Sequence, residues 1–410
     1  MKLKNIKFLA ASEAYALYLL TGLACVTIGG SMTQLAKHFN VGVAQIAVFG
    51  SCYAFGRVAT VFISGYLTEK FGPKPVVFVG SIFLLAFLLG VPNTTNYILG
   101  LVFSALGGMG MGTQDATCPV ILHAVFPKRY PSAMSAGQAF FGIGSFTLPL
   151  IMSVVLFLNL PFQVTFFILA IVPILMIVVL PFINFKRIGC TGKNESKNDD
   201  EQEIEQEHQP ELKLKNRKLG NICFYISCFS YSAVVSSIAL YTSTYVTSFG
   251  VPESLAVSML SVYNIGSMIG SMIFVIILRK VHTTSVAWIN SAFSLACIIA
   301  ILSVKSVPVL FICFALAGFF LGVIFSLILS ISTGLNPKHP SIAAAAVAVI
   351  GGSADVLSPF ITGTAVTNFG IRSAFYYIVI MLVVTIGCTM IFRKLYTARL
   401  KSDAQMIESN

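Results

Sequence analysis

The chain contains few charged residues. Only 10% of its 410 residues are Asp, Glu, Lys or Arg, whereas 56% are apolar, and the mean hydropathy is +0.87. Because water-soluble globular domains do not have this balance, a soluble enzyme and a nucleic-acid-binding protein are excluded as first interpretations. The charge is also concentrated: 8 of the 26 Lys and Arg and 8 of the 15 Asp and Glu lie between Lys186 and Lys218. The composition indicates an integral membrane protein.

The sequence also lacks the motifs of several functional classes. It has no phosphate-binding G-x-x-x-x-G-K-[ST], and the 33 residues of 186–218 are too few for an ATPase domain, so primary pumping is excluded. It has neither a serine nucleophile elbow nor H-E-x-x-H, so no enzymatic activity is predicted. The nine cysteines are an odd number without metal-type spacing. No metal site and no cofactor are therefore expected.

Twelve apolar segments are long enough to cross a bilayer, whose hydrocarbon core of about 30 Å needs roughly 20 helical residues. Helices satisfy their own backbone hydrogen bonds in lipid, so we expect an all-α protein with twelve transmembrane helices and the lipid bilayer as its surroundings. The predicted spans are 8–35, 43–68, 75–93, 97–125, 133–158 and 162–184, followed by 219–247, 254–279, 284–303, 307–333, 342–367 and 371–392.

The spans group as six plus six around a polar segment. We expect an N-terminal six-helix bundle at 1–185, a cytoplasmic linker at 186–218, a C-terminal six-helix bundle at 219–393 and a cytoplasmic tail at 394–410. With the N-terminus inside, 22 Lys and Arg lie in cytoplasmic segments and three lie outside. This bias predicts a multi-pass plasma-membrane protein with both termini in the cytoplasm.

The two halves repeat one another at an offset of 210 residues. Residues 51–56 (SCYAFG) fall on 261–266 (SVYNIG), and Gly112 falls on Gly322. Two pseudo-symmetric six-helix bundles related by such a repeat are typical of membrane transporters.

The end of the second span carries a recognisable motif, with Gly65, Glu69, Lys70, Gly72 and Lys74 at characteristic spacing. It resembles the signature that the major facilitator superfamily has in the loop between helices 2 and 3. The resemblance implies two bundles that rock about a central site, with this loop as a gate on the cytoplasmic face. A basic juxtamembrane turn is the simpler reading of the same residues.

A narrower resemblance lies in the glycine-rich run 107–119 and in 137–144, which contains Phe-Phe-Gly-Ile-Gly. These segments look like the fucose:proton symporter group, which implies a sugar or related metabolite moved together with protons. Close packing between membrane helices explains the glycines without any such role.

Three charged residues are predicted near the middle of the membrane: Arg57, Asp115 and Asp355. A charge there costs about 2.5–3.5 kcal/mol, so each is a functional candidate. In the superfamily's arrangement Arg57 and Asp355 would pair across the seam between the bundles, in a structural or a functional ion pair. Asp115 would face the cavity, where a carboxylate can carry the coupling proton.

Four uncharged polar residues are further candidates. Gln114, Gln138, Tyr241 and Asn264 could line the substrate cavity, although interhelical hydrogen bonding explains each of them about as well.

These features together predict a secondary active transporter that moves a small polar organic solute by alternating access. We expect protons as the coupling ion, a small-molecule substrate, no nucleic acid and a monomeric protein. A drug or metabolite efflux antiporter is the alternative within transport. A membrane sensor or receptor that moves no solute is the alternative outside it.

Overall fold

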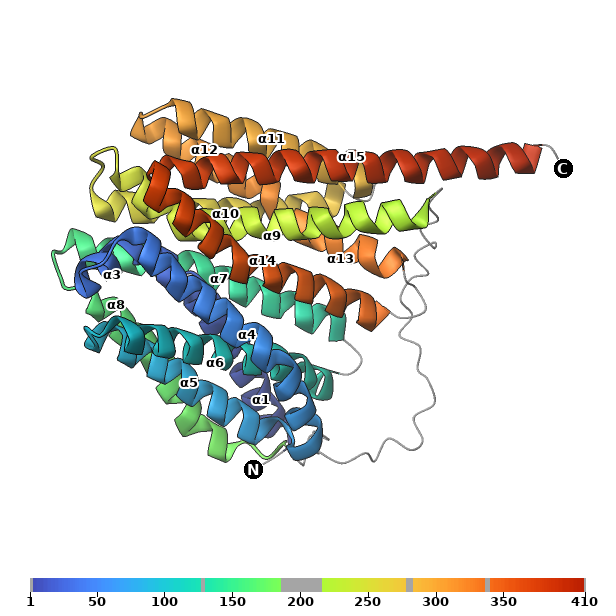
Figure 1. The fold of residues 1–410 in the computed structure, drawn as a ribbon. Helices are drawn as coiled ribbons and strands as arrows, with labels where there is room; N and C mark the ends of the chain where they lie inside the picture. Colours follow the sequence, from blue (N-terminus) through green and yellow to red (C-terminus); the bar gives the residue numbers. More distant parts are fainter. Residues whose placement is uncertain (1–2, 127–129, 186–215, 278–282, 336–339, 409–410) are drawn as a thin grey trace. The chain divides into compact units, whose positions relative to one another are not determined.

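The computed structural model describes residues 3–126, 130–185, 216–277, 283–335 and 340–408. Within these ranges the protein is helical and contains no strand, which confirms the predicted all-α membrane fold (Figure 1). Most of the predicted linker 186–218 lies outside the described residues.

The helices of the first half are joined by short turns. These helices are α1 (Leu3–Cys25), α2 (Thr27–Gly30), α3 (Met32–Phe39), α4 (Val43–Phe71), α5 (Pro73–Asn93), α6 (Tyr97–Val125), α7 (Tyr130–Phe157) and α8 (Gln163–Val179). A 3-10 turn, η2 (Leu180–Phe182), follows α8.

The second half begins after the linker. Its helices are α9 (Arg217–Thr247), α10 (Glu253–Ile277), α11 (Thr283–Ser303), α12 (Val307–Gly322), α13 (Ile324–Leu335), α14 (Pro340–Phe369) and α15 (Arg372–Glu408).

In the described part of the chain, eleven helical segments are long and apolar enough to cross a membrane. The twelfth predicted span, 97–125, corresponds to α6, which has 29 residues and contacts α1, α4 and α5. Its glycines, together with Gln114 and Asp115, lower its hydropathy. α6 is thus the span that carries the polar candidates Gln114 and Asp115.

Two predicted spans are interrupted. Span 8–35 breaks at Val26 and Ser31, whose backbone angles leave the helical region (φ −100° and −112°). The Thr27 hydroxyl donates to the Leu23 carbonyl at 2.9 Å and the Ser31 hydroxyl to the Thr27 carbonyl at 2.6 Å. Such bonds bend helices, and the pair Gly29 and Gly30 adds little resistance. Span 307–333 likewise divides into α12 and α13.

The described helices form two compact units. One comprises Met1–Lys197 with Ala239–Asn264 and Val356–Ile371, and the other comprises the remaining segments. The first unit thus includes the ends of α9, α10 and α14 that the sequence analysis predicts to lie on the extracellular side of the membrane. The bundle boundaries drawn from the sequence repeat stay predictions.

Helices α4 and α6 approach closely at glycines. A Cβ atom on Gly56 would lie 2.2 Å from the Ala105 carbonyl oxygen, and one on Gly112 would lie 2.5 Å from that of Arg57. Atoms cannot approach so closely, so only glycine fits here. This is the small-residue packing that membrane helices use when lipid removes the hydrophobic drive for association.

The second half makes the same crossing between α10 and α12. A Cβ atom on Gly266 would lie 2.1 Å from the Ala315 oxygen, and one on Gly322 would lie 2.2 Å from the Ser267 oxygen. Gly266 and Gly322 each follow their first-half counterparts by 210 residues, and so do the carbonyls that they meet. The repeat read from the sequence is therefore also a repeat of backbone contacts.

We expect Gly112→Ala and Gly322→Ala each to lower the thermal stability of the purified protein. Overpacking of this kind costs about 1–3 kcal/mol, which exceeds the helix propensity that alanine gains, about 1 kcal/mol. Gly387→Ala in α15 is the matched control, because no atom lies within 4 Å of its Cβ position. Equal melting temperatures for all three variants would contradict the close crossing.

Candidate functional site

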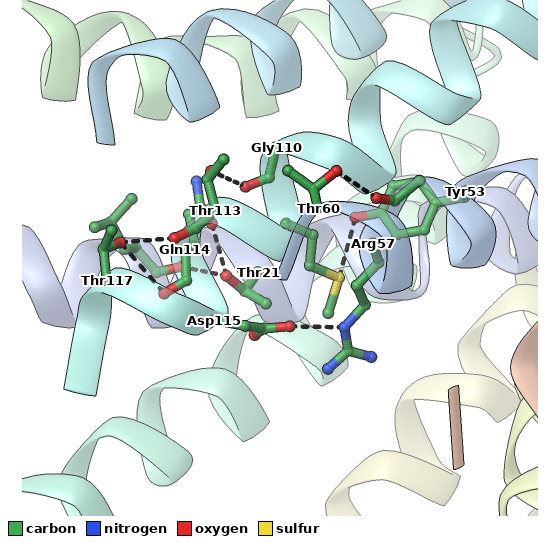
Figure 2. A network of polar contacts seen from close by, with 12 residues as sticks. Thr21, Tyr53, Arg57, Thr60, Gly110, Thr113, Gln114, Asp115 and Thr117 are labelled. Carbon is green, nitrogen blue, oxygen red and sulfur yellow. Dashed lines mark hydrogen bonds and ion pairs between the residues drawn. The ribbon is translucent and has the colours of Figure 1, made fainter. Parts of the chain in front are cut away.

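An ion pair joins α4 and α6 in the first compact unit. Nε of Arg57 donates to Oδ2 of Asp115 at 2.7 Å (Figure 2). The side chains are 37% and 25% exposed, respectively. Two of the three charges predicted near mid-membrane therefore lie together.

The close approach of α4 and α6 at glycine residues positions this ion pair. A Cβ atom on Gly108 would lie 1.8 Å from the Tyr53 carbonyl oxygen, one turn of α4 before Arg57. Gly112 meets the Arg57 carbonyl itself, and Asp115 follows it by one helical turn. The backbones are thus close enough for a direct side-chain bond.

Arg57 points away from the apolar surface of α4. The exposed residues Phe55, Phe62, Ile63 and Tyr66 form one stripe, and at about 100° per residue Arg57 lies nearly opposite it. An exposed ion pair facing hydrocarbon would be costly. The exposed part of Arg57 therefore lies on the side of α4 opposite this apolar stripe.

The pair has no counterpart in the second half. The repeat places Ser267 at the position of Arg57 and Phe325 at the position of Asp115. The crossing of α10 and α12 nevertheless forms with the same glycine contacts. The helix packing therefore does not require the charges, which separates the ion pair from the scaffold that holds it.

Gln114 lies next to the pair and is fully buried. Its Oε1 accepts a hydrogen bond from the Thr21 hydroxyl of α1 at 2.7 Å (Figure 2). In the described part of the chain its Nε2 has no hydrogen-bond partner. Buried amide donors are normally satisfied, so this one is a candidate to bind a ligand.

Glu13 of α1 is a polar residue that the sequence analysis missed. It is 4% exposed, and among the described residues its Oε1 has no hydrogen-bond partner. The neighbouring Ala14 carbonyl accepts a bond from the Cys118 thiol of α6 at 3.9 Å. An acidic residue inside predicted span 8–35 was the available signal. A buried charge without a partner is costly, so Glu13 is the second carboxyl group that could hold a proton here.

Asp355, the third predicted charge, lies in α14 and in the second compact unit. The predicted pair of Arg57 with Asp355 stays a prediction. Asp115 is the partner that the first unit provides for Arg57.

The other cavity candidates differ in their surroundings. Gln138 is exposed on α7. The Tyr241 hydroxyl is buried and accepts a bond from the Thr362 hydroxyl at 3.1 Å, while Nδ2 of Asn264 donates to the Ser145 carbonyl at 2.9 Å. These bonds link Tyr241 and Asn264 to neighbouring helices. A role in substrate binding stays a prediction for Gln138, Tyr241 and Asn264.

The predicted gate motif forms the turn between α4 and α5. Gly72 adopts φ +81°, a conformation that favours glycine, and Lys74 donates to the carbonyls of Pro181 and Ile183 at 3.0 and 3.3 Å. Lys70 lies over the rings of Tyr66 and Phe71. Glu69 is exposed, and Gly65 has no atom within 4 Å of its Cβ position. The gating role of the motif stays a prediction.

Within the described ranges, no three His, Cys, Asp or Glu side chains gather as a metal site would require. The polar groups described in this region are the ion pair, the Gln114 amide and the Glu13 carboxyl group.

Comparison with known proteins agrees with this architecture. Residues 14–290 match the family model of the Major Facilitator Superfamily. The chain belongs to this superfamily. It is a multi-pass membrane protein of a transporter family, and the resemblance carried by residues 65–74 is confirmed at this level. The narrower resemblance to fucose:proton symporters stays a prediction.

Two bacterial relatives align over most of the chain. An uncharacterised MFS-type transporter of Bacillus subtilis, YfkL, is 26% identical over 92% of this chain and 93% of its own length. The inner membrane transport protein YdiN of Escherichia coli is 25% identical over 91% of this chain and 86% of its own length.

Solved structures of transporters share the fold. The nucleoside transporter NupG superposes with a TM-score of 0.75 at 12% identity, over 95% of this chain and 99% of its own. A D-xylose–proton symporter reaches 0.74 at 13% identity, over 95% and 97%.

A double-mutant cycle on Arg57 and Asp115 measures the ion pair. Because each substitution removes the 2.7 Å ion pair from a half-buried charge, Arg57→Ala and Asp115→Ala should each destabilise the protein. The double variant should be less destabilised than the sum, as read from thermal unfolding in detergent. Strict additivity would contradict the pair. The same cycle on Arg57 and Asp355 tests the pairing predicted from the sequence.

Replacing Gly72 should slow the transport cycle. A side chain at φ +81° strains the turn between α4 and α5, at about 1–3 kcal/mol. We therefore expect Gly72→Leu to lower the turnover of solute exchange more than it lowers apparent affinity. Gly65→Ala is the steric control, because its Cβ position is open. A normal exchange rate for Gly72→Leu would argue against a gating role.

Proposed function

We propose that the protein is a secondary active transporter that moves a small polar organic solute by alternating access, with protons as the coupling ion. The observation that carries the proposal is the Arg57–Asp115 ion pair between α4 and α6. Membership of the superfamily supports transport in general, whereas the ion pair bears on the coupling.

The pair supplies a chemical reason for coupling. Protonation of Asp115 removes the negative charge that balances Arg57, which cannot itself lose its proton. The energy of the site therefore depends on whether Asp115 is protonated. Proton binding and solute binding at this place therefore influence one another, which is what a coupled transporter needs.

Contacts at the predicted extracellular end of the first unit support alternating access. Lys37 of α3 forms an ion pair with Glu253 of α10, and Gln34 donates to the same carboxylate at 2.9 Å. The Ser243 hydroxyl of α9 donates to the Gly29 carbonyl at 2.9 Å. Helices of both sequence halves are thus joined at the ends that the sequence predicts to lie outside. These bonds would have to open to admit solute from that side.

Several finer features complete the proposal. We place the protein in the plasma membrane with both termini in the cytoplasm, and we expect it to act as a monomer. The neighbours in fold carry nucleosides, D-xylose and peptides by name, so a polar organic solute is the class that the proposal adopts.

Asp115→Asn should separate accumulation from exchange. The amide cannot take up the coupling proton, so uphill uptake into proteoliposomes under a pH gradient should be lost. Solute exchange at equal concentrations should persist, since it needs no net proton movement. Asp115→Glu is the matched control and should retain part of the accumulation. Wild-type accumulation by Asp115→Asn would show that Asp115 is not the coupling site, and Glu13 would then be the next residue to test.

A further inference from the structure

We infer that Glu13 of α1 is a second proton-carrying group of the transport cycle, which holds a proton in this structure and relays it from Asp115 to the cytoplasm. The inference rests on the proposed function and adds a residue to its proton path. It starts from a buried carboxyl group that has no hydrogen-bond or ion-pair partner in the described part of the chain.

Glu13 lies in the middle of the buried face of α1. It is 4% exposed, and Ala10, Leu17 and Leu20, which share this face at spacings of three or four residues, are fully buried. Its Oε1 has no hydrogen-bond partner among the described residues, and the ion pairs found there do not include it. An apolar side chain would fill this position at a lower cost, so packing alone does not explain an acid here.

The surroundings of the two carboxyl groups indicate which of them is charged. Oδ2 of Asp115 accepts a hydrogen bond from Nε of Arg57 at 2.7 Å, and such a contact favours the ionised form. Glu13 has no ion-pair partner among the described side chains, and an ionised carboxylate without a partner is costly in apolar surroundings. The proton therefore belongs on Glu13 in this structure, while Asp115 is ionised.

A contact between α1 and α6 gives the depth of Glu13 relative to Asp115. The Cys118 thiol of α6 donates to the Ala14 carbonyl of α1 at 3.9 Å. Glu13 directly precedes Ala14, and Asp115 precedes Cys118 by three residues. Since α1 and α6 correspond to the first and fourth predicted spans, they run in opposite directions. At 1.5 Å per residue, Glu13 lies about 6 Å closer to the predicted cytoplasmic end than Asp115.

A second unpartnered polar atom lies on the other side of this contact. Gln114, which neighbours Asp115 in Figure 2, is fully buried, and its Nε2 has no hydrogen-bond partner among the described residues. Buried polar atoms are normally satisfied by protein groups or by ordered water. One water molecule with two hydrogen bonds of about 2.8 Å spans about 5.5 Å, so one or two waters cover the difference in depth between Asp115 and Glu13.

The titratable groups around Glu13 make α6 the side from which a proton can come. Helix α1 packs against α2, α6, α7 and α8. Among their described side chains α2, α7 and α8 carry no titratable group, whereas α6 carries Asp115, Cys118 and, exposed near its end, His123. The described titratable side chains of α1 other than Glu13 are Lys7, Tyr15, Tyr18 and Cys25. Asp115 is therefore the one other acid that these helices present among the described side chains.

The relay balances protons and charge. Glu13 first gives its proton to cytoplasmic water, and the electron pair of the broken O–H bond stays on the carboxylate. When Asp115 is protonated during the cycle, its O–H bond breaks toward the bridging water, and an O–H bond of that water breaks toward Glu13. Asp115 is then ionised beside Arg57 and Glu13 carries a proton, which is the arrangement in this structure. Each turn of the cycle moves one proton.

Infrared spectroscopy locates the proton without any solute. The full-length protein in lipid at neutral pH should show the C=O band of a protonated carboxylic acid. Glu13→Gln should lose this band, whereas Asp115→Asn should keep it. A wild-type spectrum without the band, or a band that persists unchanged in Glu13→Gln, would overturn the inference.

Uptake into proteoliposomes tests the relay. The probes are D-xylose, uridine and alanyl-alanine, which represent the solutes that the neighbours in fold carry by name, together with a bacterial metabolite extract read by mass spectrometry. Glu13→Gln should lower the initial rate of uptake driven by a pH gradient at least tenfold, because the proton leaves slowly. Exchange at equal solute concentration and equal pH should stay within twofold of wild type. Glu13→Asp keeps a carboxyl group and should recover part of the rate.

Thermal stability separates a relay from a structural role. Glu13→Met fills the same apolar face without a proton, so it should melt at or above the wild-type temperature and still show the slow uptake of Glu13→Gln. Leu17→Met, on the same face, is the matched control and should transport normally. A lower melting temperature for Glu13→Met with normal uptake per folded protein would show a structural role and overturn the relay. Should Glu13→Gln fail to fold, Glu13→Met and Glu13→Asp decide the question.

The remaining outcomes distinguish the relay from the proposed function. Wild-type uptake rates for Glu13→Gln and Glu13→Met would overturn the relay and leave the proposed function standing. Loss of all accumulation in Glu13→Gln, with normal accumulation in Asp115→Asn, would make Glu13 the coupling site itself and overturn the relay. Failure of the wild type to accumulate any solute would overturn the proposed function and the relay with it, whereas the infrared band would still show whether Glu13 holds a proton.

Discussion

The close approach of α4 and α6 at glycine is the constraint on which the candidate site depends. Gly112 lets α6 touch the backbone of Arg57, and Asp115 one turn later then reaches the side chain of the same residue. A larger residue at the crossing would separate the helices and lengthen the ion pair. In water such a contact would compete with hydrophobic packing elsewhere, but in lipid the packing of small residues is itself a main source of helix association.

The repeat within the chain shows which features belong to the scaffold. Both halves use glycines 210 residues apart to bring a pair of helices together, yet only the first half places charges there. An uncompensated charge in a bilayer is expensive, and a scaffold that forms without charges has no structural need for them. The duplicated crossing therefore explains the packing of the helices, and we propose a functional role for the ion pair.

The sequence predicts the fold well because the length and apolarity of each span are local properties that lipid enforces. The repeat can also be read directly along the chain. It predicts the partner of Arg57 less well. Depth along a helix can be counted from its ends, but the direction in which Arg57 points depends on how α4 rotates against α6. Proximity to Asp115 therefore emerges only in three dimensions. Glu13 was missed although it stands inside span 8–35, and the breaks at Val26 and Ser31 depend on hydroxyl bonds that hydropathy does not register.

The bond between Lys37 and Glu253 has a consequence for the surroundings in which the protein works. Lys37 is 68% exposed, so salt in the medium screens this pair, with a Debye length of about 8 Å at physiological ionic strength. Exposed ion pairs contribute only about 0–1 kcal/mol. Small as this is, 1 kcal/mol shifts a two-state population about fivefold. In the proposed cycle, a higher external salt concentration would therefore favour opening at the outer ends of the helices. An uncharged solute at the same osmolarity would not, because it does not screen charges.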